Sequence, residues 1–290
     1  MKSLNPIYSA LFDESKYFDR WYQLCHFSVL CLATSSIFAS RTLLYAIVIA
    51  GLLSQAGLLI FGHLSERSRA MAHRIERISM VVTAFGGEQG DFDISDLKGN
   101  LSARVHKLSA LKAKEQEPTT KYNLPSHIPA NEALGFLIQE NSYWNHHLFA
   151  VSARRAWIRF LFIVVLLTVA ALFWVVLVGL SSSSLVGATI LMIFLSSLRL
   201  WEELKKALIW RDSSASMFAI DSMLRNPDNR RSPSVTLPFA NYCAVNEQTP
   251  AISQRIYDAH SAKLHDGWAT RKEEMTKGWI KQEPIAVPPQ

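Results

Sequence analysis

The sequence has little of the chemistry from which catalytic and metal sites are built. Its three cysteines, Cys25, Cys31 and Cys243, fall in no metal-ligand spacing and no disulfide framework, so we expect buried thiols in a reducing setting. It contains no phosphate-binding glycine loop and no GxSxG, HExxH or paired CxxC motif. These absences predict a protein that is not an enzyme and that needs no metal or cofactor.

Two groups of possible metal ligands have unsuitable spacing. A calcium loop that starts at Asp91 would need glycine where Asp96 stands, so a solvated turn is the default and at most a weak divalent site remains. His146 and His147 are adjacent in a helical stretch and point in different directions, whereas haem in a bundle needs histidines on facing spans. Only His26 lies within an apolar span. We therefore expect a histidine pair at a polar interface.

Acidic residues and lysines are absent from four apolar stretches, each close to the roughly 20 residues that a bilayer core requires. They are residues 24–39, 43–62, 160–180 and 185–200. Little more than SRT separates the first two, and SSSS separates the last two, which leaves room only for tight turns. We predict an all-α, polytopic membrane protein with four transmembrane helices in two hairpins. A cleaved signal peptide at 24–39 is disfavoured by the long, partly acidic segment before it.

Basic residues are scarce in the two hairpin turns, which contain only Arg41. Elsewhere they flank the spans: Lys16 and Arg20; Arg67, Arg69, Arg74 and Arg77; Arg154, Arg155 and Arg159; Lys205, Lys206 and Arg211. Because positive residues stay on the cytoplasmic side, we expect both termini and the middle segment in the cytoplasm, with the spans in a bacterial inner membrane. The net charge of +6 then belongs to the inner rim of the membrane and implies no nucleic acid polymer as partner.

Helical patterns continue outside the hairpins. Apolar residues recur with helix spacing through residues 63–85 and between 134 and 151, and a short basic helix is expected at 101–114. Asn131 is the expected cap of the helix that leads into the third span. The fourth span is expected to continue to about Ser222. After a proline-punctuated loop, Thr249 and Pro250 are expected to begin a C-terminal helix.

These patterns predict five segments. They are an amphipathic helix at 1–23, transmembrane hairpin 1 at 24–62, a cytoplasmic helical region with a linker at 63–156, transmembrane hairpin 2 at 157–201 and a cytoplasmic helical region at 202–290. Long helices that leave the membrane on one side with apolar faces must pack on something. A cytoplasmic helical bundle that is continuous with the spans is the simplest arrangement.

Small and polar residues within the spans indicate helix packing. The small-residue stripe in the second span contains Ala46, Ala50 and Ser54, and a shorter one contains Ser183 and Gly187. Gln55 lies in mid-bilayer and needs a hydrogen-bond partner. We expect these residues to pack within one four-span bundle. The alternative is that they meet other copies in a homo-oligomer and line a pore.

The C-terminal region carries a resemblance. The sequence SQRIYDAHSAKLHDGW, followed by RKEEM, resembles the SMODS-associated four-transmembrane effectors, whose pattern of a glutamine, an Ile-Tyr pair and an arginine would correspond to Gln254, Ile256, Tyr257 and His260, with Trp268 in the aromatic patch. Here His260 replaces the usual arginine, and Arg255 stands where an acidic residue is common. Lys16 matches the lysine of the Tyr-x-x-Ala-Lys pattern of the first helix, and Asn141 and Trp144 match the Asn-x-x-Trp segment before the third span.

The resemblance implies a CBASS effector that accompanies a nucleotide second-messenger synthase in bacterial anti-phage defence. Such an effector disrupts the membrane of the infected cell, and the result is abortive infection. We expect a non-enzymatic effector that a cyclic nucleotide or a partner triggers to oligomerise or rearrange. Candidate contacts for this signal are Arg74, Arg77, His146, Arg255, Tyr257 and His260, since cations pair with phosphates and aromatic rings stack on bases. The alternatives are that the arginines contact lipid headgroups and Tyr257 packs in the bundle, and that the chain is a constitutive channel or membrane-scaffold subunit without a nucleotide response.

Overall fold

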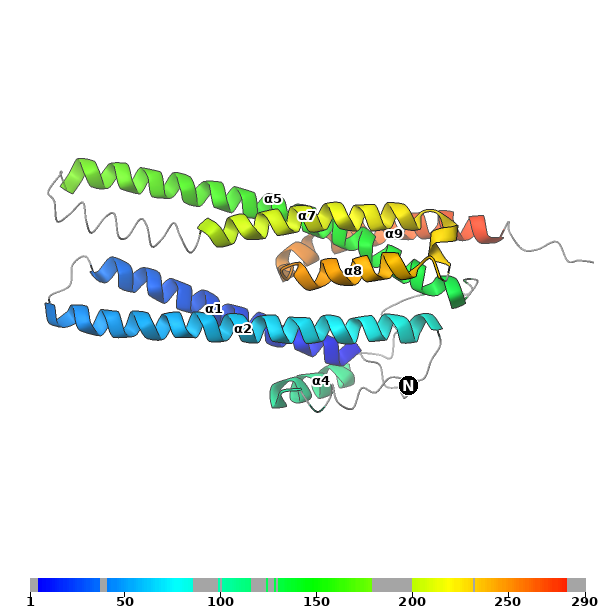
Figure 1. Ribbon diagram of the computed structural model, residues 1–290, viewed down its shortest axis with the longest axis horizontal. Helices are drawn as coiled ribbons and strands as arrows, with labels where there is room; N and C mark the ends of the chain where they lie inside the picture. The colour runs from blue at the N-terminus through cyan, green and yellow to red at the C-terminus, as the bar shows by residue number, and fades with distance from the viewer. Residues whose placement is uncertain are drawn as a thin grey trace, which may run out of the picture. The chain divides into compact units, whose positions relative to one another are not determined.

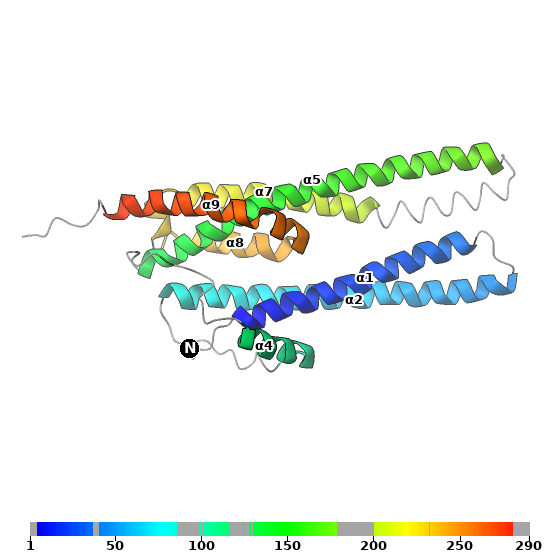
Figure 2. The same ribbon diagram turned by 180° about the vertical axis from the view of Figure 1, so that it is seen from behind.

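The computed structural model describes residues 5–36, 41–85, 99, 101–115, 124, 128, 130–178, 200–231 and 233–280. These residues form helices and no strands, which confirms the all-α prediction (Figure 1; Figure 2). The helices are α1 (Asn5–Ser36), α2 (Arg41–Phe85), α4 (Ala103–Glu115), α5 (Ala130–Val178), α7 (Trp201–Leu224), the 3-10 helix η3 (Pro227–Arg230), α8 (Thr236–Gln248) and α9 (Gln254–Ile280).

The long helices follow from the lack of proline inside them. Helix α2 has 45 residues and α5 has 49, so at 1.5 Å per residue each is roughly 70 Å long. The predicted extension of the second span to Phe85 is therefore confirmed, as is the short basic helix now labelled α4. Helix α5 begins at Ala130, so Asn131 lies inside its first turn instead of preceding it.

One prediction about the C-terminal region is wrong. The segment taken for a proline-punctuated loop contains helix α8. Pro238 is compatible with this helix because it stands in the first turn, where its missing N–H costs no hydrogen bond. Thr249 does not begin a helix. It is the residue that ends α8, and its N–H donates to the carbonyl oxygen of Val245. The last helix begins later, at Gln254.

The described chain divides into two compact units. Unit 1 comprises Met1–Tyr8, His73–Ser152 and Ile209–Gln290, and unit 2 comprises Ser9–Ala72 and Ala153–Leu208. In unit 1, the first part of α5 lies beside α7, α8 and α9 (Figure 1; Figure 2). Its core holds most of the large fully buried side chains: Ile75, Met80, Val105, Phe136, Leu137, Ile138, Met217, Leu224, Pro238 and Tyr242. Unit 1 thus has a closed interior of its own.

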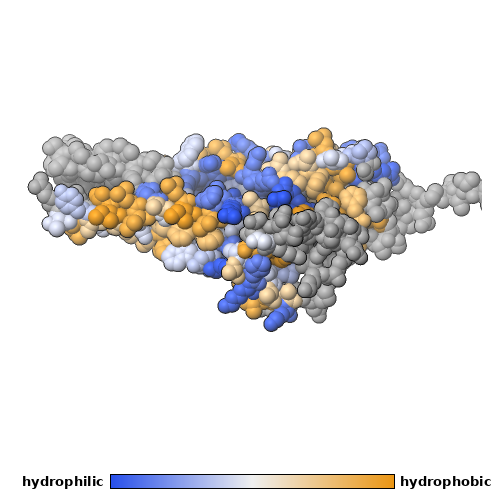
Figure 3. Space-filling view, turned by 60° about the horizontal axis from the view of Figure 1, so that its bottom comes forward, coloured by the Kyte–Doolittle hydropathy of each residue, from blue (hydrophilic) through white to orange (hydrophobic). Residues whose placement is uncertain are grey.

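Unit 2 instead presents an apolar surface. Most of the exposed large hydrophobic side chains belong to it, including Leu24, Phe27, Leu43, Val48, Ile49, Leu52, Leu53, Leu59, Ile60, Leu161, Phe162, Val165, Leu166, Val169 and Leu172. Hydrophobic side chains gather over the N-terminal half of α2 (Figure 3). A surface of this kind is unusual for a monomer in water, because contiguous exposed apolar patches mark interaction or membrane sites.

Among the described residues, one helix segment, Tyr45–Phe85, is long and apolar enough to cross a membrane. Only 6% of its most apolar 18-residue stretch is buried, whereas the core helix of a water-soluble protein is mostly buried. This segment contains most of the predicted second span. The first predicted span lies largely in α1 and the third in α5 as far as Val178, whereas residues 185–199 of the fourth lie outside the described residues.

Candidate functional site

The six residues proposed to contact a signal all belong to unit 1, but they do not form one site. Arg74 on α2 and Arg255 on α9 are exposed, and His260 is half-buried. Next to Arg255 in the sequence, Ile256 is buried, so the two side chains lie on different sides of α9. A ligand could therefore reach Arg74 and Arg255, although the structure places them on separate helices.

Tyr257 takes part in the contact between α5 and α9. Its ring stacks on Trp144 with centroids 6.0 Å apart, and the ring of His265 meets the same tryptophan edge-on at 4.5 Å. Beneath them, Leu148, Ile256 and Leu264 form a buried cluster, against which Tyr143, Trp144, Val151 and Ile252 pack. Tyr257 remains 41% exposed. It therefore supports helix packing and still offers one ring face or edge to solvent.

His146 is occupied by contacts to α7. Its Nδ1 lies 3.0 Å from the carbonyl oxygen of Ser214, which can only accept, so this hydrogen bond requires a proton on Nδ1. The Ser214 hydroxyl donates in turn to the carbonyl oxygen of His146 at 2.9 Å, and Phe218 packs against the imidazole with ring centroids 5.1 Å apart. This arrangement joins α5 to α7 and gives His146 a packing role.

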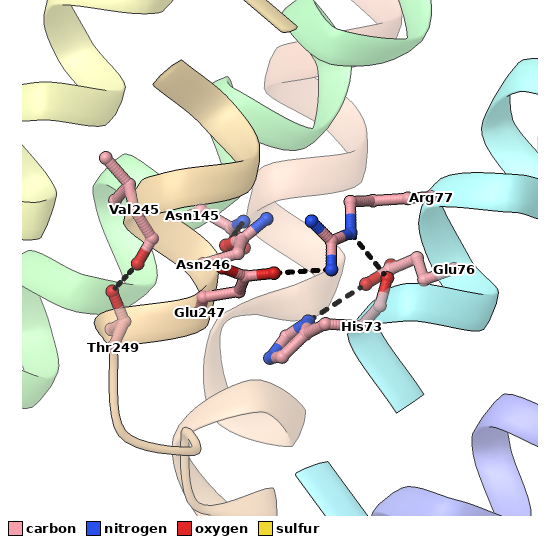
Figure 4. Close-up of polar contacts among 8 residues, drawn as sticks. All are labelled: His73, Glu76, Arg77, Asn145, Val245, Asn246, Glu247 and Thr249. Carbon is pink, nitrogen blue, oxygen red and sulfur yellow. Dashed lines mark hydrogen bonds and ion pairs between the residues drawn. The ribbon is translucent and has the colours of Figure 1, made fainter. Parts of the chain in front are cut away.

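Arg77 joins α2 to α8 (Figure 4). Its Nη2 lies 2.5 Å from Oε1 of Glu247, and its Nε donates to the carbonyl oxygen of His73 at 3.4 Å. Nearby, Nδ1 of His73 lies 3.4 Å from Oε2 of Glu76 (Figure 4). Burial raises the pKa of the adjacent Cys243 thiol, and the opposing effect of Arg77 is smaller. Cys243 is therefore a poor nucleophile at neutral pH.

A second polar cluster of unit 1 was missed by the sequence analysis. Arg271 on α9 forms a two-point ion pair with Asp221 on α7, with N–O distances of 2.9 and 2.6 Å. The guanidinium carbon lies 5.4 Å from the ring centroid of Tyr143 and 5.8 Å from that of Trp268. Asp221 is only 3% exposed. The sequence signal for this pair is Asp221 itself, which stands among the apolar residues of α7. A carboxylate that is buried with such residues needs a partner, although the sequence does not say which.

His147 lies in the electrostatic field of the same cluster. Burial is the largest cause that lowers the pKa of His147, and His146, Lys263 and Arg271 lower it further, while Asp221 opposes them. The imidazole is therefore neutral at pH 7. Among the residues that the structure describes, no group of three or more histidine, cysteine, aspartate or glutamate side chains is placed to hold a metal ion. Asp91, Asp93 and Asp96 lie outside them.

Unit 2 contains a polar cluster at the start of α7, which we name the collar: Tyr22, His26, Arg159, Glu202 and Glu203. The hydroxyl of Tyr22 donates to Oε1 of Glu202, and Nε2 of His26 lies 3.2 Å from the same oxygen, so α7 is joined to α1. Nε of Arg159 lies 3.1 Å from Oε2 of Glu203, which joins α7 to α5. Both carboxylates stand in the first turn of α7, where the helix dipole favours negative charge.

The ionised state of Glu202 is strongly favoured. Burial alone would raise the pKa of this carboxyl, but the hydrogen bonds from His26 and Tyr22 outweigh that effect, and the pKa falls from its usual 4.5 to about 2. Glu203 is 2% exposed overall and pairs with an arginine that is half exposed. The collar therefore holds two carboxylates in a partly desolvated region, where each depends on its partners.

The seam between α1 and α2 explains part of the predicted packing stripe. Ala50, Ser54 and Gln55 are partly buried on α2, whereas Ala46 is exposed, and Ser183 and Gly187 lie outside the described residues. The sequence analysis missed Gly57, where an added Cβ would lie 2.8 Å from Sγ of Cys25. Hydrogen bonds continue the seam: Ser15 and Ser65 are 3.0 Å apart, and Ser68 donates to Glu14 at 2.8 Å.

Comparison with known proteins identifies no relative. No protein-family model matches the chain, and neither does any curated protein or solved structure. The resemblance to the four-transmembrane effectors therefore stays a prediction that rests on the residues quoted for it.

Proposed function

We propose that the chain is a non-enzymatic effector in a bacterial inner membrane, with four transmembrane helices and cytoplasmic termini, which disrupts the membrane when a signal reaches unit 1. One observation carries the membrane part of the proposal, and the effector role rests on the resemblance. Helices α2 and α5 expose apolar side chains in unit 2, and they continue without a break into unit 1, where their side chains enter a closed core. Apolar helix surface that the chain leaves uncovered needs lipid or further copies to cover it.

The mechanism follows from the continuity of the helices. A ligand that binds one arrangement of unit 1 better than another changes the tilt or rotation of α2, α5 and α7, and no break inside these helices absorbs the change. In unit 2 the collar then loses its hydrogen bonds to α1, and hairpin 1 separates from hairpin 2. The freed helix faces associate with lipid or with other copies as a homo-oligomer.

The signal in this proposal is a cyclic nucleotide or a partner protein such as its synthase, as the resemblance implies. Arg77 and His146 are engaged by Glu247 and Ser214, which leaves Arg74, Arg255 and the exposed part of Tyr257 as the accessible candidates for contact. Replacement of Arg255, Tyr257 and His260 together is expected to abolish the response to a nucleotide. If the response is intact in this variant, the C-terminal helix is not the contact site.

The test is a dye-uptake assay in bacteria that express the chain from an inducible promoter, alone and beside a panel of cyclic-nucleotide synthases. The proposal predicts uptake only with one active synthase and none with its catalytically dead variant. Uptake without any synthase would favour a constitutive channel. No uptake with any synthase, with the protein verified in the membrane fraction, would favour a membrane-scaffold subunit. Recovery of the chain in the soluble fraction would contradict both the effector and these alternatives.

A further inference from the structure

Helix α4 (Ala103–Glu115) has a one-sided charge that no function above uses. Arg104, Lys107, Lys112 and Lys114 are basic, and the only acidic residue is Glu115 at its end. The helix is stable for local reasons. The hydroxyl of Ser102 accepts from the N–H of Val105 at 3.2 Å at the N-terminus, and the lysines of the last turn suit the negative end of the helix dipole.

Burial divides α4 into two faces. Val105 is 0% exposed and anchors the helix in unit 1. On the other side, Arg104, Lys107, Leu111 and Lys114 are exposed, and Leu111 is 48% exposed. At about 100° per residue these four positions fall within a band about 80° wide. We name them the basic stripe: three cations on one helix face with an exposed leucine among them.

We infer that the basic stripe of α4 binds anionic lipid headgroups. Lysine and arginine pair with headgroup phosphates, and an exposed leucine between them enters the boundary between headgroups and acyl chains, as in helices that lie on a membrane surface. The inference rests on the membrane part of the proposed function, in which lipid covers the exposed apolar surface of unit 2 in the same chain. It does not depend on the signal.

Charge complementarity alone would also fit a nucleic acid, but the composition of α4 favours lipid. None of the four residues of the stripe has an aromatic ring on which a base could stack, and the imidazole of His106 lies about 80° outside the band. A leucine in the centre of the stripe gains nothing from a phosphate backbone. Each basic residue near an anionic surface contributes roughly a five-fold gain in binding, so Lys107 and Lys114 together give roughly a 25-fold gain that salt weakens. Headgroup binding would fix α4 and, through Val105, the part of unit 1 that contains it.

Hydrogen exchange of the full-length chain in nanodiscs tests this inference. One set of discs contains only phosphatidylcholine and the other contains phosphatidylglycerol at about a third of the lipid, chosen as a strongly anionic surface. We expect amides of residues 103–115 to exchange at least several-fold more slowly in the anionic discs. The double variant Lys107→Glu, Lys114→Glu is expected to lose this difference, and Leu111→Ser to reduce it. The matched control Lys263→Glu, Lys277→Glu, which changes two exposed lysines on α9, is expected to keep it.

Failure of the inference and failure of the proposed function give different results. If the chain inserts in discs but residues 103–115 exchange equally in both lipids, the basic stripe does not bind headgroups. Slower exchange in neutral discs on addition of an RNA oligonucleotide, without an effect of phosphatidylglycerol, would assign the stripe to nucleic acid and overturn the inference. If the chain does not insert in discs at all, the membrane part of the proposed function is wrong.

Discussion

Replacement of Glu202 by glutamine removes the charge at the centre of the collar while it keeps the shape of the side chain. A carboxyl whose pKa falls from 4.5 to about 2 is stabilised in its ionised form by about 3 kcal/mol, because one pKa unit corresponds to about 1.4 kcal/mol. Since Glu202 retains some solvent access, with 22% of its side chain exposed, we expect a loss of about 2 kcal/mol at pH 7.

The sign of the pH dependence follows from the lowered pKa. Above pH 4.5 the native and unfolded states are both ionised at Glu202, and the contribution to the free energy of unfolding is fully present. It decreases as the pH falls from 4.5 toward 2, where the native carboxyl also binds a proton. The difference in stability between the original chain and Glu202→Gln should therefore be largest at neutral pH and should shrink across this interval.

The assay is thermal unfolding of the purified full-length chain in detergent, at pH 7 and at steps below 4.5. We expect Glu202→Gln to lower the Tm by roughly 4–8 °C at pH 7, since 1 kcal/mol corresponds to roughly 2–4 °C at this size. Asp212→Asn, on the same helix and with a side chain that is 68% exposed, is the matched control and should change little. Tyr22→Phe combined with Glu202→Gln should cost less than the sum of the two. An unchanged Tm, strict additivity or a deficit that persists at pH 2 would refute the reasoning.

Three further substitutions test the packing of each unit by the same assay. Asp221→Asn removes one partner of a buried ion pair and leaves the charge of Arg271, so we expect a loss of about 3 kcal/mol, and a neutral result would contradict the pairing. Gly57→Val should disrupt the α1–α2 seam by about 1–3 kcal/mol, whereas Gly51→Val, where a Cβ meets nothing within 4 Å, should not. Gln139→Met should stabilise by about 1 kcal/mol, because the fully buried amide of Gln139 has no hydrogen-bond partner among the described residues.

The sequence predicted the helices well where the periodic pattern was long and free of proline. Helix α2 extends to Phe85 as its apolar spacing indicated, and α7 reaches Leu224, two residues beyond the predicted end. Helix α8 escaped prediction because Pro238 was taken for a breaker, although a proline in the first turn is compatible with a helix. The local sequence pattern therefore predicts most of these helices. The error arose because a proline can either interrupt a helix or stand in its first turn.

The polar clusters could not be predicted in the same way. Helical periodicity assigns a residue to a face, but it does not say which residue of another helix lies opposite. Arg271 and Asp221 are separated by 50 positions, and Glu202 and His26 by 176. Their pairing depends on how the helices pack in each unit, which the sequence pattern leaves open. The same reason explains why Tyr257 and Arg255, adjacent to one buried isoleucine, lie in different surroundings.

The distribution of contacts in unit 2 indicates where a signal of modest free energy would act. The seam between α1 and α2 is held at several points: Gly57 allows close approach to α1, Trp21 stacks on Phe61 with ring centroids 5.9 Å apart, and Ser15 bonds to Ser65. Between α1 and α7, the hydrogen bonds of Tyr22 and His26 converge on the carboxylate of Glu202, with a contribution of about 2 kcal/mol. Coupling free energies between sites are typically about 1–3 kcal/mol, which is enough to release such a connection but not to unfold a hairpin. If this comparison holds, Glu202→Gln should lower the amount of synthase needed for dye uptake, while Gly57→Val should impair the protein with any amount.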